Sequence, residues 1–251
     1  MLTREVRILF GKEWRQLLRS RSAMLTALFL PVLMLVVVPG IQMMAVSAGE
    51  GVAGANVPRG MTLPPGLEAM RDDPRAMLRA FLPAFIALGG LIVPAVTASY
   101  TLISERASRT LELLVALPVR VGQILLAKLL ALLALAWLVT LVLLSIDAGL
   151  ILVLGLGSVG YVLALLSVLL SALAFSTTAA LLVSLLARDF RTSNNLNGVL
   201  IGPTIIACFS LIMALPSPTL AALVIAALFT VGAGVSIFVA MKLITFERLL
   251  R

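Results

Sequence analysis

The sequence predicts an all-α membrane protein with six transmembrane helices, an amphipathic helix before the first span and a short cytoplasmic helix between spans two and three. Of its 251 residues, 61% are hydrophobic and 12% are charged, and the mean hydropathy is +1.16. A soluble domain carries about 25% charged residues, so this chain has too little polar surface to cover a globule in water. The charges also gather in short stretches between long apolar runs, as in a helical bundle in lipid.

Residues 1–22 are predicted to form an amphipathic helix in the plane of the membrane surface. Apolar side chains recur along it at helical spacing, and the cations lie mostly on the other faces. A tryptophan in such a basic segment favours a place at the headgroup level, with the apolar stripe in the acyl boundary. The residues that we assign to this interfacial helix are Lys12, Glu13, Trp14 and Arg19. The alternative is a basic flank that only orients the first span.

Six apolar runs follow, and each is long enough to cross a bilayer. We predict spans at residues 23–46, 80–102, 124–146, 159–187, 198–215 and 220–244. Pro83 and Pro94 lie inside the second span, where neighbouring helices can satisfy the backbone groups that they free. Residues 47–79 form a polar external loop, residues 148–157 either dip into the membrane or are the mobile end of a helix, and residues 188–197 are expected to be a polar loop.

The lysines and arginines orient the six spans. Fifteen of the 19 lie at the chain ends, in residues 103–128 or after span four, and four lie in the loop 47–79. Because cytoplasmic loops carry the excess of cations, we expect both termini in the cytoplasm of a multi-pass protein of the inner or plasma membrane. The net charge of +8 is thus explained by topology and not by nucleic-acid binding, since the cations form no basic domain.

One connecting segment, residues 103–120, is more informative than the spans. Ser104 can cap a helix, Glu105 in the first turn favours the helix dipole, and Pro118 ends the helix before span three. We therefore expect a short cytoplasmic helix held between two spans, so that a partner pushing on it would move both. The alternative is a basic loop that sets the topology and nothing more.

Two stretches of the sequence carry motifs. The first combines Glu-Arg at 105–106, Thr-Leu-Glu-Leu-Leu at 110–114, Leu-Pro at 117–118 and Ile-Leu-Leu-Ala-Lys at 124–128. It resembles the coupling-helix region of ATP-binding-cassette (ABC) exporter permeases of the type-2 family. The second, Lys-Glu-Trp at 12–14 with Leu-Arg-Ser-Arg at 18–21, is similar to the interfacial connecting helix of that family. Arg109 departs from the pattern, because many relatives carry Gly there.

The resemblance implies a permease subunit of an ATP-driven exporter, itself non-catalytic, that pairs with a second copy or with a related permease. It implies that two copies of a separate ATP-binding subunit hold ATP and Mg²⁺ and dock on the coupling segment, while this chain binds no cofactor. The chain has no Gly-x-x-x-x-Gly-Lys-Ser/Thr loop of its own. The residues expected to contact the ATP-binding partner are Glu105, Arg106, Ser108, Arg109, Thr110, Leu111, Glu112, Leu113 and Leu114.

Few residues within the spans suggest chemistry. Asp147 is the only acid in a long apolar stretch, and we interpret it as an interfacial helix end rather than a functional charge in the membrane. Ser176, Thr177 and Thr178 could line a polar pathway, although such hydroxyls more often bond the backbone or a neighbouring helix. Asp189, between two arginines, either contacts a partner or ends a helix in solvent.

Composition also limits the alternatives. Histidine is absent and Cys208 is the only cysteine, which excludes imidazole ligation, intrachain disulfides and thiolate clusters, so we expect no metal site. The spans hold no pair of carboxylates, so we expect no catalytic residues. A transporter or channel without an ATPase would need coupling residues in the membrane, and a membrane scaffold for a maturation complex is hard to distinguish from a permease by sequence. The substrate is not readable from the sequence.

Overall fold

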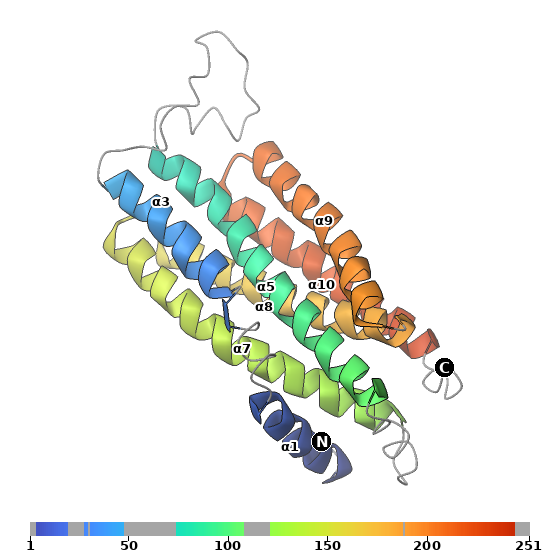
Figure 1. The fold of residues 1–251 in the computed structure, drawn as a ribbon. Helices are drawn as coiled ribbons and strands as arrows, with labels where there is room; N and C mark the ends of the chain where they lie inside the picture. The colour runs from blue at the N-terminus through green and yellow to red at the C-terminus, as the bar shows by residue number, and fades with distance from the viewer. Residues whose placement is uncertain are drawn as a thin grey trace.

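The computed structural model describes residues 4–19, 28–29, 31–47, 74–107, 121–187 and 189–243. The regular structure of these residues is helical throughout (Figure 1). A helix satisfies its own backbone polar groups, which a lipid environment requires because it offers no water to replace them. The long apolar segments of this chain therefore fold as helices and pack side by side.

Five helices in the described part of the chain are long and apolar enough to cross a membrane. They are α5 (Pro74–Ala107), α7 (Val121–Val153), α8 (Val159–Leu186), α9 (Phe190–Ala214) and α10 (Pro218–Leu243). Each runs antiparallel to the one before it (Figure 1). Helices α5 and α7 extend beyond the predicted spans 80–102 and 124–146 at both ends. The difference arises because hydropathy marks where an apolar run ends and not where the helix ends.

The first predicted span, residues 23–46, is described only in part. A π-helix, η1 (Val32–Val37), continues into α3 (Val38–Ser47), and the apolar helix within them covers Val32–Met44. Pro39 lies just after the π-helix and lacks an N–H, which favours a local change in the hydrogen-bond spacing. This helix is shorter than the five candidate spans.

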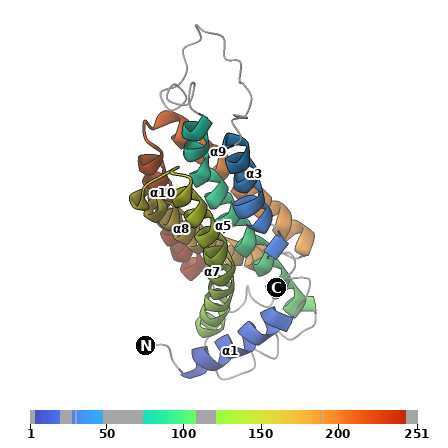
Figure 2. The same cartoon turned by 90° about the vertical axis from the view of Figure 1, so that its left-hand side faces the viewer.

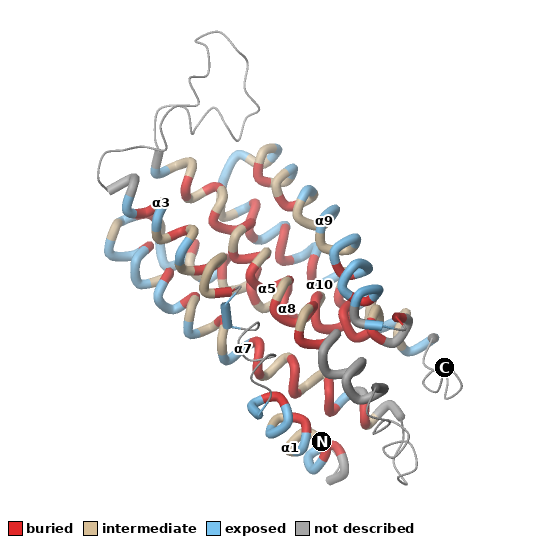
Figure 3. Tube along the Cα trace, viewed as in Figure 1, coloured by how far each residue is buried: buried red, intermediate tan, exposed pale blue. Residues whose placement is uncertain are grey.

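Helix α5 is at the centre of the bundle. Of its apolar window 72% is buried, against 17% for α9, and the difference is visible along the tube in Figure 3. Two glycines let other helices approach the α5 backbone. A Cβ added at Gly89 would lie 2.8 Å from the Cγ of Leu35, and one added at Gly90 would lie 3.1 Å from the Cβ of Ala172. The region of η1 and helix α8 therefore pack directly on this backbone.

Of residues 148–157, which we expected to dip into the membrane or to be the mobile end of a helix, the first part is the end of α7 and the rest is a tight turn to α8. Helix α7 continues to Val153, and Gly155 then takes a φ of +64°, a conformation that glycine reaches without steric cost. The N–H of Leu156 donates to the carbonyl of Ile151 over 2.9 Å, and both side chains are buried. Together these contacts form the Schellman arrangement that ends many helices.

Helix α9 begins inside the segment that we expected to be a polar loop. Asp189 is its N-cap and accepts hydrogen bonds from the N–H of Thr192 over 2.6 Å and from its hydroxyl over 3.1 Å. These bonds hold the pKa of the Asp189 carboxyl below its ordinary value of 3.8. Of our two readings of Asp189, the structure supports the exposed helix end. The sequence does not reveal this helix start, because the Ser, Thr and Asn residues that follow Asp189 are also typical of loops.

Helix α1 (Arg4–Arg19) lies across the end of α7, at a steep angle to the bundle axis (Figure 2). The C-terminal ends of α5 and α10 lie at this same end of the bundle (Figure 1). The turn between α7 and α8 lies at the opposite end. Helix α1 and the C-terminal end of α10 thus lie at one end of the bundle. The end of α5 and the start of α7, which flank residues 108–120, lie at the same end.

Candidate functional site at the junction of α1 and α7

The apolar stripe of α1 packs mainly against protein. Val6, Leu9 and Leu17 are buried, each on the side of the helix that faces α7. Their contacts on α7 form two small clusters that include Ile124, Ala127, Ala131, Leu132 and Leu135. By contrast, Ile8 and Leu18 are exposed, with 64% and 44% of their surface accessible. The buried stripe is therefore not the face of α1 that meets lipid.

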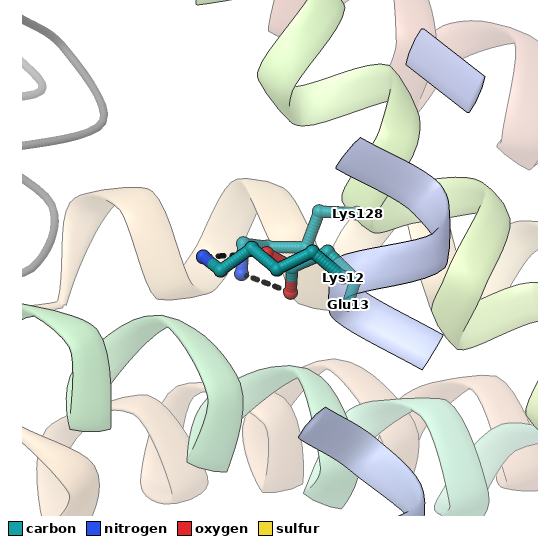
Figure 4. A network of polar contacts seen from close by, with 3 residues as sticks. All are labelled: Lys12, Glu13 and Lys128. Carbon is teal, nitrogen blue, oxygen red and sulfur yellow. Dashed lines mark hydrogen bonds and ion pairs between the residues drawn. The ribbon is translucent and has the colours of Figure 1, made fainter. Parts of the chain in front are cut away.

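A carboxylate interrupts this buried stripe. Glu13 follows Leu9 and precedes Leu17 by one helical turn each, so it points at α7, and only 3% of its surface is exposed. Its Oε2 lies 2.8 Å from the Nζ of Lys128 on α7, and Lys128 is 1% exposed (Figure 4). Lys12, which is partly exposed, approaches the other carboxylate oxygen at 3.4 Å. Two helices far apart in the sequence are thus joined by a buried ion pair.

The energetic consequence of the pair is asymmetric. Burying two opposite charges together adds little net stability, but leaving one of them buried alone costs about 3–5 kcal/mol. Glu13 and Lys128 therefore act as a positional lock, since α1 cannot slide or rotate on α7 without exposing an unpaired charge to an apolar environment. On the same helix, Phe10 and Trp14 stack on each other, with ring centroids 6.1 Å apart and planes at 14°.

The ion pair also brings together the two motifs. Glu13 belongs to the Lys-Glu-Trp motif, and Lys128 is the last residue of the Ile-Leu-Leu-Ala-Lys motif. Sequence reasoning treated them separately, and the signal that it missed is simple. Glu13 is an acid on an apolar stripe, Lys128 is a cation inside an apolar run, and two such residues stabilise each other when paired.

The residues predicted to contact an ATP-binding partner fall at the edge of the described structure. Glu105 and Arg106 lie in the last turn of α5, where the structure describes the helical backbone but not the side chains. The others, Ser108, Arg109, Thr110, Leu111, Glu112, Leu113 and Leu114, lie outside the described residues. Ser104 does not cap a new helix, so that prediction is wrong. Helix α5 continues through it to Ala107 because nothing between the span and residue 107 breaks the helix.

Comparison with known families decides the identity of the chain. A family model described as ABC-2 family transporter protein matches residues 7–216, which include most of α1, both motifs and the helices through α9. The chain belongs to this family. It is therefore a multi-pass membrane protein and a permease component of an ABC transporter. No curated protein and no solved structure matches it.

In this permease, Ser176, Thr177 and Thr178 lie in the buried middle of α8. The Ser176 hydroxyl donates across the helix interface to the carbonyl of Leu91 on α5. The hydroxyls of Thr177 and Thr178 donate to backbone carbonyls of α8, those of Leu173 and Ala174. All three are therefore engaged by backbone groups in the arrangement described. Their predicted place along a pathway stays a prediction.

Asp147 differs from our expectation. We interpreted it as an interfacial helix end, but α7 continues for six further residues and Asp147 is 0% exposed. The helix goes on because the residues after Asp147 are apolar or small and contain no proline. Among the described residues neither carboxylate oxygen has a hydrogen-bond partner. A buried carboxyl of this kind is costly to ionise.

Sequence reasoning also missed Asn197 and Tyr161. Asn197 on α9 is buried, and its Nδ2 donates to the carbonyl of Ala95 on α5 over 3.1 Å. The Tyr161 hydroxyl on α8 donates to the carbonyl of Arg79 on α5. That carbonyl lacks the usual N–H donor four residues on, because that position is Pro83. A proline followed by a tyrosine on a neighbouring span was the signal that could have suggested this contact.

Proposed function

We propose that this permease works in an ATP-driven exporter in which ATP hydrolysis on separate subunits moves a substrate across the inner or plasma membrane. Six spans would cross the bilayer, with the described helix Val32–Met44 belonging to the first of them. The end of the bundle that carries α1 and the ends of α5 and α10 would face the cytoplasm, since most of the cations lie there. The chain itself would be non-catalytic.

The partners follow from this proposal. Two copies of an ATP-binding subunit would carry ATP and Mg²⁺ and would dock on the segment from Glu105 to Leu114. A second permease, either a copy or a relative, would complete the transporter, with the pathway between facing spans. Ser176, Thr177 and Thr178 stay candidates for that pathway. For these hydroxyls to contact a substrate, opening of the bundle would have to break their present hydrogen bonds to backbone carbonyls.

The junction of α1 and α7 is the observation that carries the proposal. Residues 108–120 connect the end of α5 to the start of α7, so a force on this segment acts on both helices. Lys128 lies within two turns of the start of α7 and is locked to Glu13 on α1. Movement of the coupling segment would therefore carry α1, α5 and α7 together, as a mechanical coupling requires.

A second function, a transporter without an ATPase, is favoured by one observation. Asp147 is a buried carboxyl in a candidate span, and acids in that position often bind protons or cations in transporters. The two functions differ in what accompanies the chain. We would purify the tagged permease from its native membrane in mild detergent, before and after cross-linking, and identify the bound proteins by mass spectrometry. A stoichiometric subunit with a phosphate-binding Gly-rich loop supports the exporter, and recovery of the chain alone supports the second function.

The first prediction concerns the coupling residues. Reversing the charge of Glu105 with Glu105→Arg should leave membrane insertion and folding intact, because the residue lies at the end of α5 beyond its candidate span. The variant should lose the permease-dependent part of the ATPase activity of the complex by at least five-fold. The control is Glu50→Arg, the same reversal in the predicted external loop, which should keep the activity. Equal activities of both variants would remove the basis for naming Glu105.

A further inference from the structure

A groove lies between α1 and α7. Its volume is about 290 Å³, close to the lower end of ligand pockets, which hold roughly 300–1,000 Å³. The walls come from Val6 and Phe10 on α1 and from Leu133, Ala134 and Trp137 on α7, and among the described residues Arg7 is the charged one that lines it. Trp137 is 42% exposed, so the groove is open to the surroundings of α7.

Arg7 also belongs to a second, polar hollow on the outer side of α1. The cations that line this hollow, which we call the basic face, are Arg7, Lys12, Arg15 and Arg19. All four are exposed. Glu13, an acid of the same helix, is buried against Lys128 and also contacts Lys12 at 3.4 Å. The basic face therefore presents a row of cations next to an apolar groove.

The groove follows α7 into its apolar part. Trp137 lies nine residues beyond Lys128, a distance of about 14 Å along the helix. The candidate span of α7 covers Leu126–Val153, so the groove lies within the part of α7 that lipid would surround. The basic face lies at the end of that span. A molecule that fits both hollows needs a negative head at the level of α1 and an apolar chain along α7.

We propose that the junction of α1 and α7 binds an anionic phospholipid, with its phosphate on Arg7 and Arg15 and one acyl chain in the groove. Charge complementarity selects the head, because cations beside a membrane attract anionic lipid and not zwitterionic lipid. The apolar walls select the chain. The bound lipid would cover the side of the junction opposite the bundle core and hold α1 at the membrane surface. This site is independent of the substrate that the permease carries.

Tryptophan fluorescence tests the proposal in the full chain. The protein has two tryptophans, Trp14 and Trp137, so the variant Trp14→Phe leaves Trp137 as the single reporter in the groove. It would be reconstituted in phosphatidylcholine vesicles that contain a small, equal fraction of dibrominated phosphatidylglycerol or dibrominated phosphatidylcholine. Bromine on an acyl chain quenches a tryptophan that it touches. We expect the anionic probe to quench Trp137 at least twice as strongly as the zwitterionic probe.

Two further variants separate the head from the chain. Arg7→Gln with Arg15→Gln should weaken binding of the anionic probe by about five-fold for each charge removed and abolish the preference. Ala134→Phe fills the groove and should also abolish it, with all four cations in place. Arg191→Gln is the matched control, because it removes an exposed charge at the start of α9 and should keep the preference.

The opposite results would overturn the proposal. Equal quenching by the two probes before any arginine is changed would mean that the groove selects no anionic lipid and that the basic face serves another occupant, such as an acidic protein surface. A preference that survives loss of Arg7 and Arg15 would place the anionic lipid elsewhere. A preference that Arg191→Gln also abolishes would reduce the effect to net charge.

Discussion

Glu13 and Lys128 each look unfavourable when considered alone, since an acid on an apolar helix face and a lysine within a span both oppose burial. In the fold they lie 2.8 Å apart and nearly inaccessible to solvent. Their value is positional, because the pair fixes where along α7 the interfacial helix sits. Lys12 also reaches Glu13, but its side chain is 44% exposed and its contribution is correspondingly small.

We expect Glu13→Gln to destabilise the permease by about 3–5 kcal/mol, because it removes the carboxylate that the buried Lys128 ammonium faces at 2.8 Å. Lys128→Met should do the same, because it removes the buried cation from Glu13, which keeps its longer contact with the exposed Lys12. The double variant Glu13→Met with Lys128→Met should recover most of the loss, since no charge is then buried. Thermal unfolding in detergent measures all three. Lys12→Met is the control and should cost less than about 1 kcal/mol. Additive losses in the double variant would show that the two residues do not act as a pair.

Asp189 gives a pH-dependent prediction. Its pKa in the fold lies below 3.8 because Thr192 donates to the charged carboxylate, so the cap is complete above pH 3.8 and is lost as the pH falls through the lower folded value. Amide hydrogen exchange of the first turn of α9 should therefore be insensitive to protonation of this group above pH 4 and increase below that range, once the intrinsic rate is subtracted. Asp189→Ala should show the faster exchange at neutral pH, whereas Asp189→Asn, which keeps an acceptor, should not. Protection that is unchanged in Asp189→Ala would contradict the capping role.

At the scale of the element, α5 combines close packing with local breaks in its backbone bonding. Pro83 and Pro94 each remove a hydrogen bond from the helix, yet the prolines lie in its most buried part. Neighbouring spans supply side-chain donors to α5 carbonyls near these breaks, from Tyr161, Ser176 and Asn197. The central helix is thus held by its neighbours through its backbone as well as through its apolar side chains.

The contact between Tyr161 and the Arg79 carbonyl can be measured as a double-mutant cycle. Tyr161→Phe should cost about 0.5–1.5 kcal/mol, because the carbonyl freed by Pro83 loses its donor. In a Pro83→Ala background the helix supplies its own N–H to that carbonyl, so the same change should cost markedly less. Chemical or thermal unfolding of the four proteins gives the coupling energy. An equal cost of Tyr161→Phe in both backgrounds would show that the hydroxyl does not serve the proline break.

At the scale of the whole molecule, burial is distributed unevenly. Helix α5 is enclosed, whereas only 17% and 28% of the apolar windows of α9 and α10 are buried within the chain. Much of the remaining surface of α9 and α10 is apolar, which in a membrane requires no polar cover. The charged features described above, the ion pair and the basic face, lie on or against α1, which is at one end of the bundle (Figure 2). This asymmetry is what a fixed orientation across the bilayer requires.

Cysteine labelling tests that orientation. Cys208 is buried and 1% exposed, and Cys208→Ala removes it without leaving a reactive background. In this background Ser217→Cys, in the turn between α9 and α10, should react with a membrane-impermeant thiol reagent in right-side-out vesicles. Arg191→Cys, at the other end of α9, should react only after the vesicles are opened. The reverse pattern would mean that α1 and the coupling segment face outward, and it would contradict the proposed docking of an ATPase.

The sequence by itself determined that the chain is a helical membrane protein, where most of the spans lie and which family it belongs to. These properties depend on local composition, on the length of apolar runs and on motifs that stay contiguous in the chain. It did not determine that Glu13 meets Lys128, that Asp147 is enclosed, or that Tyr161 serves a carbonyl freed by Pro83. Each of these depends on which face of one helix meets another helix far along the chain. Only the tertiary structure decided them. Burial of a polar residue in an apolar segment is favourable only when a partner lies within reach, and the packing of the helices determines which residue that partner is.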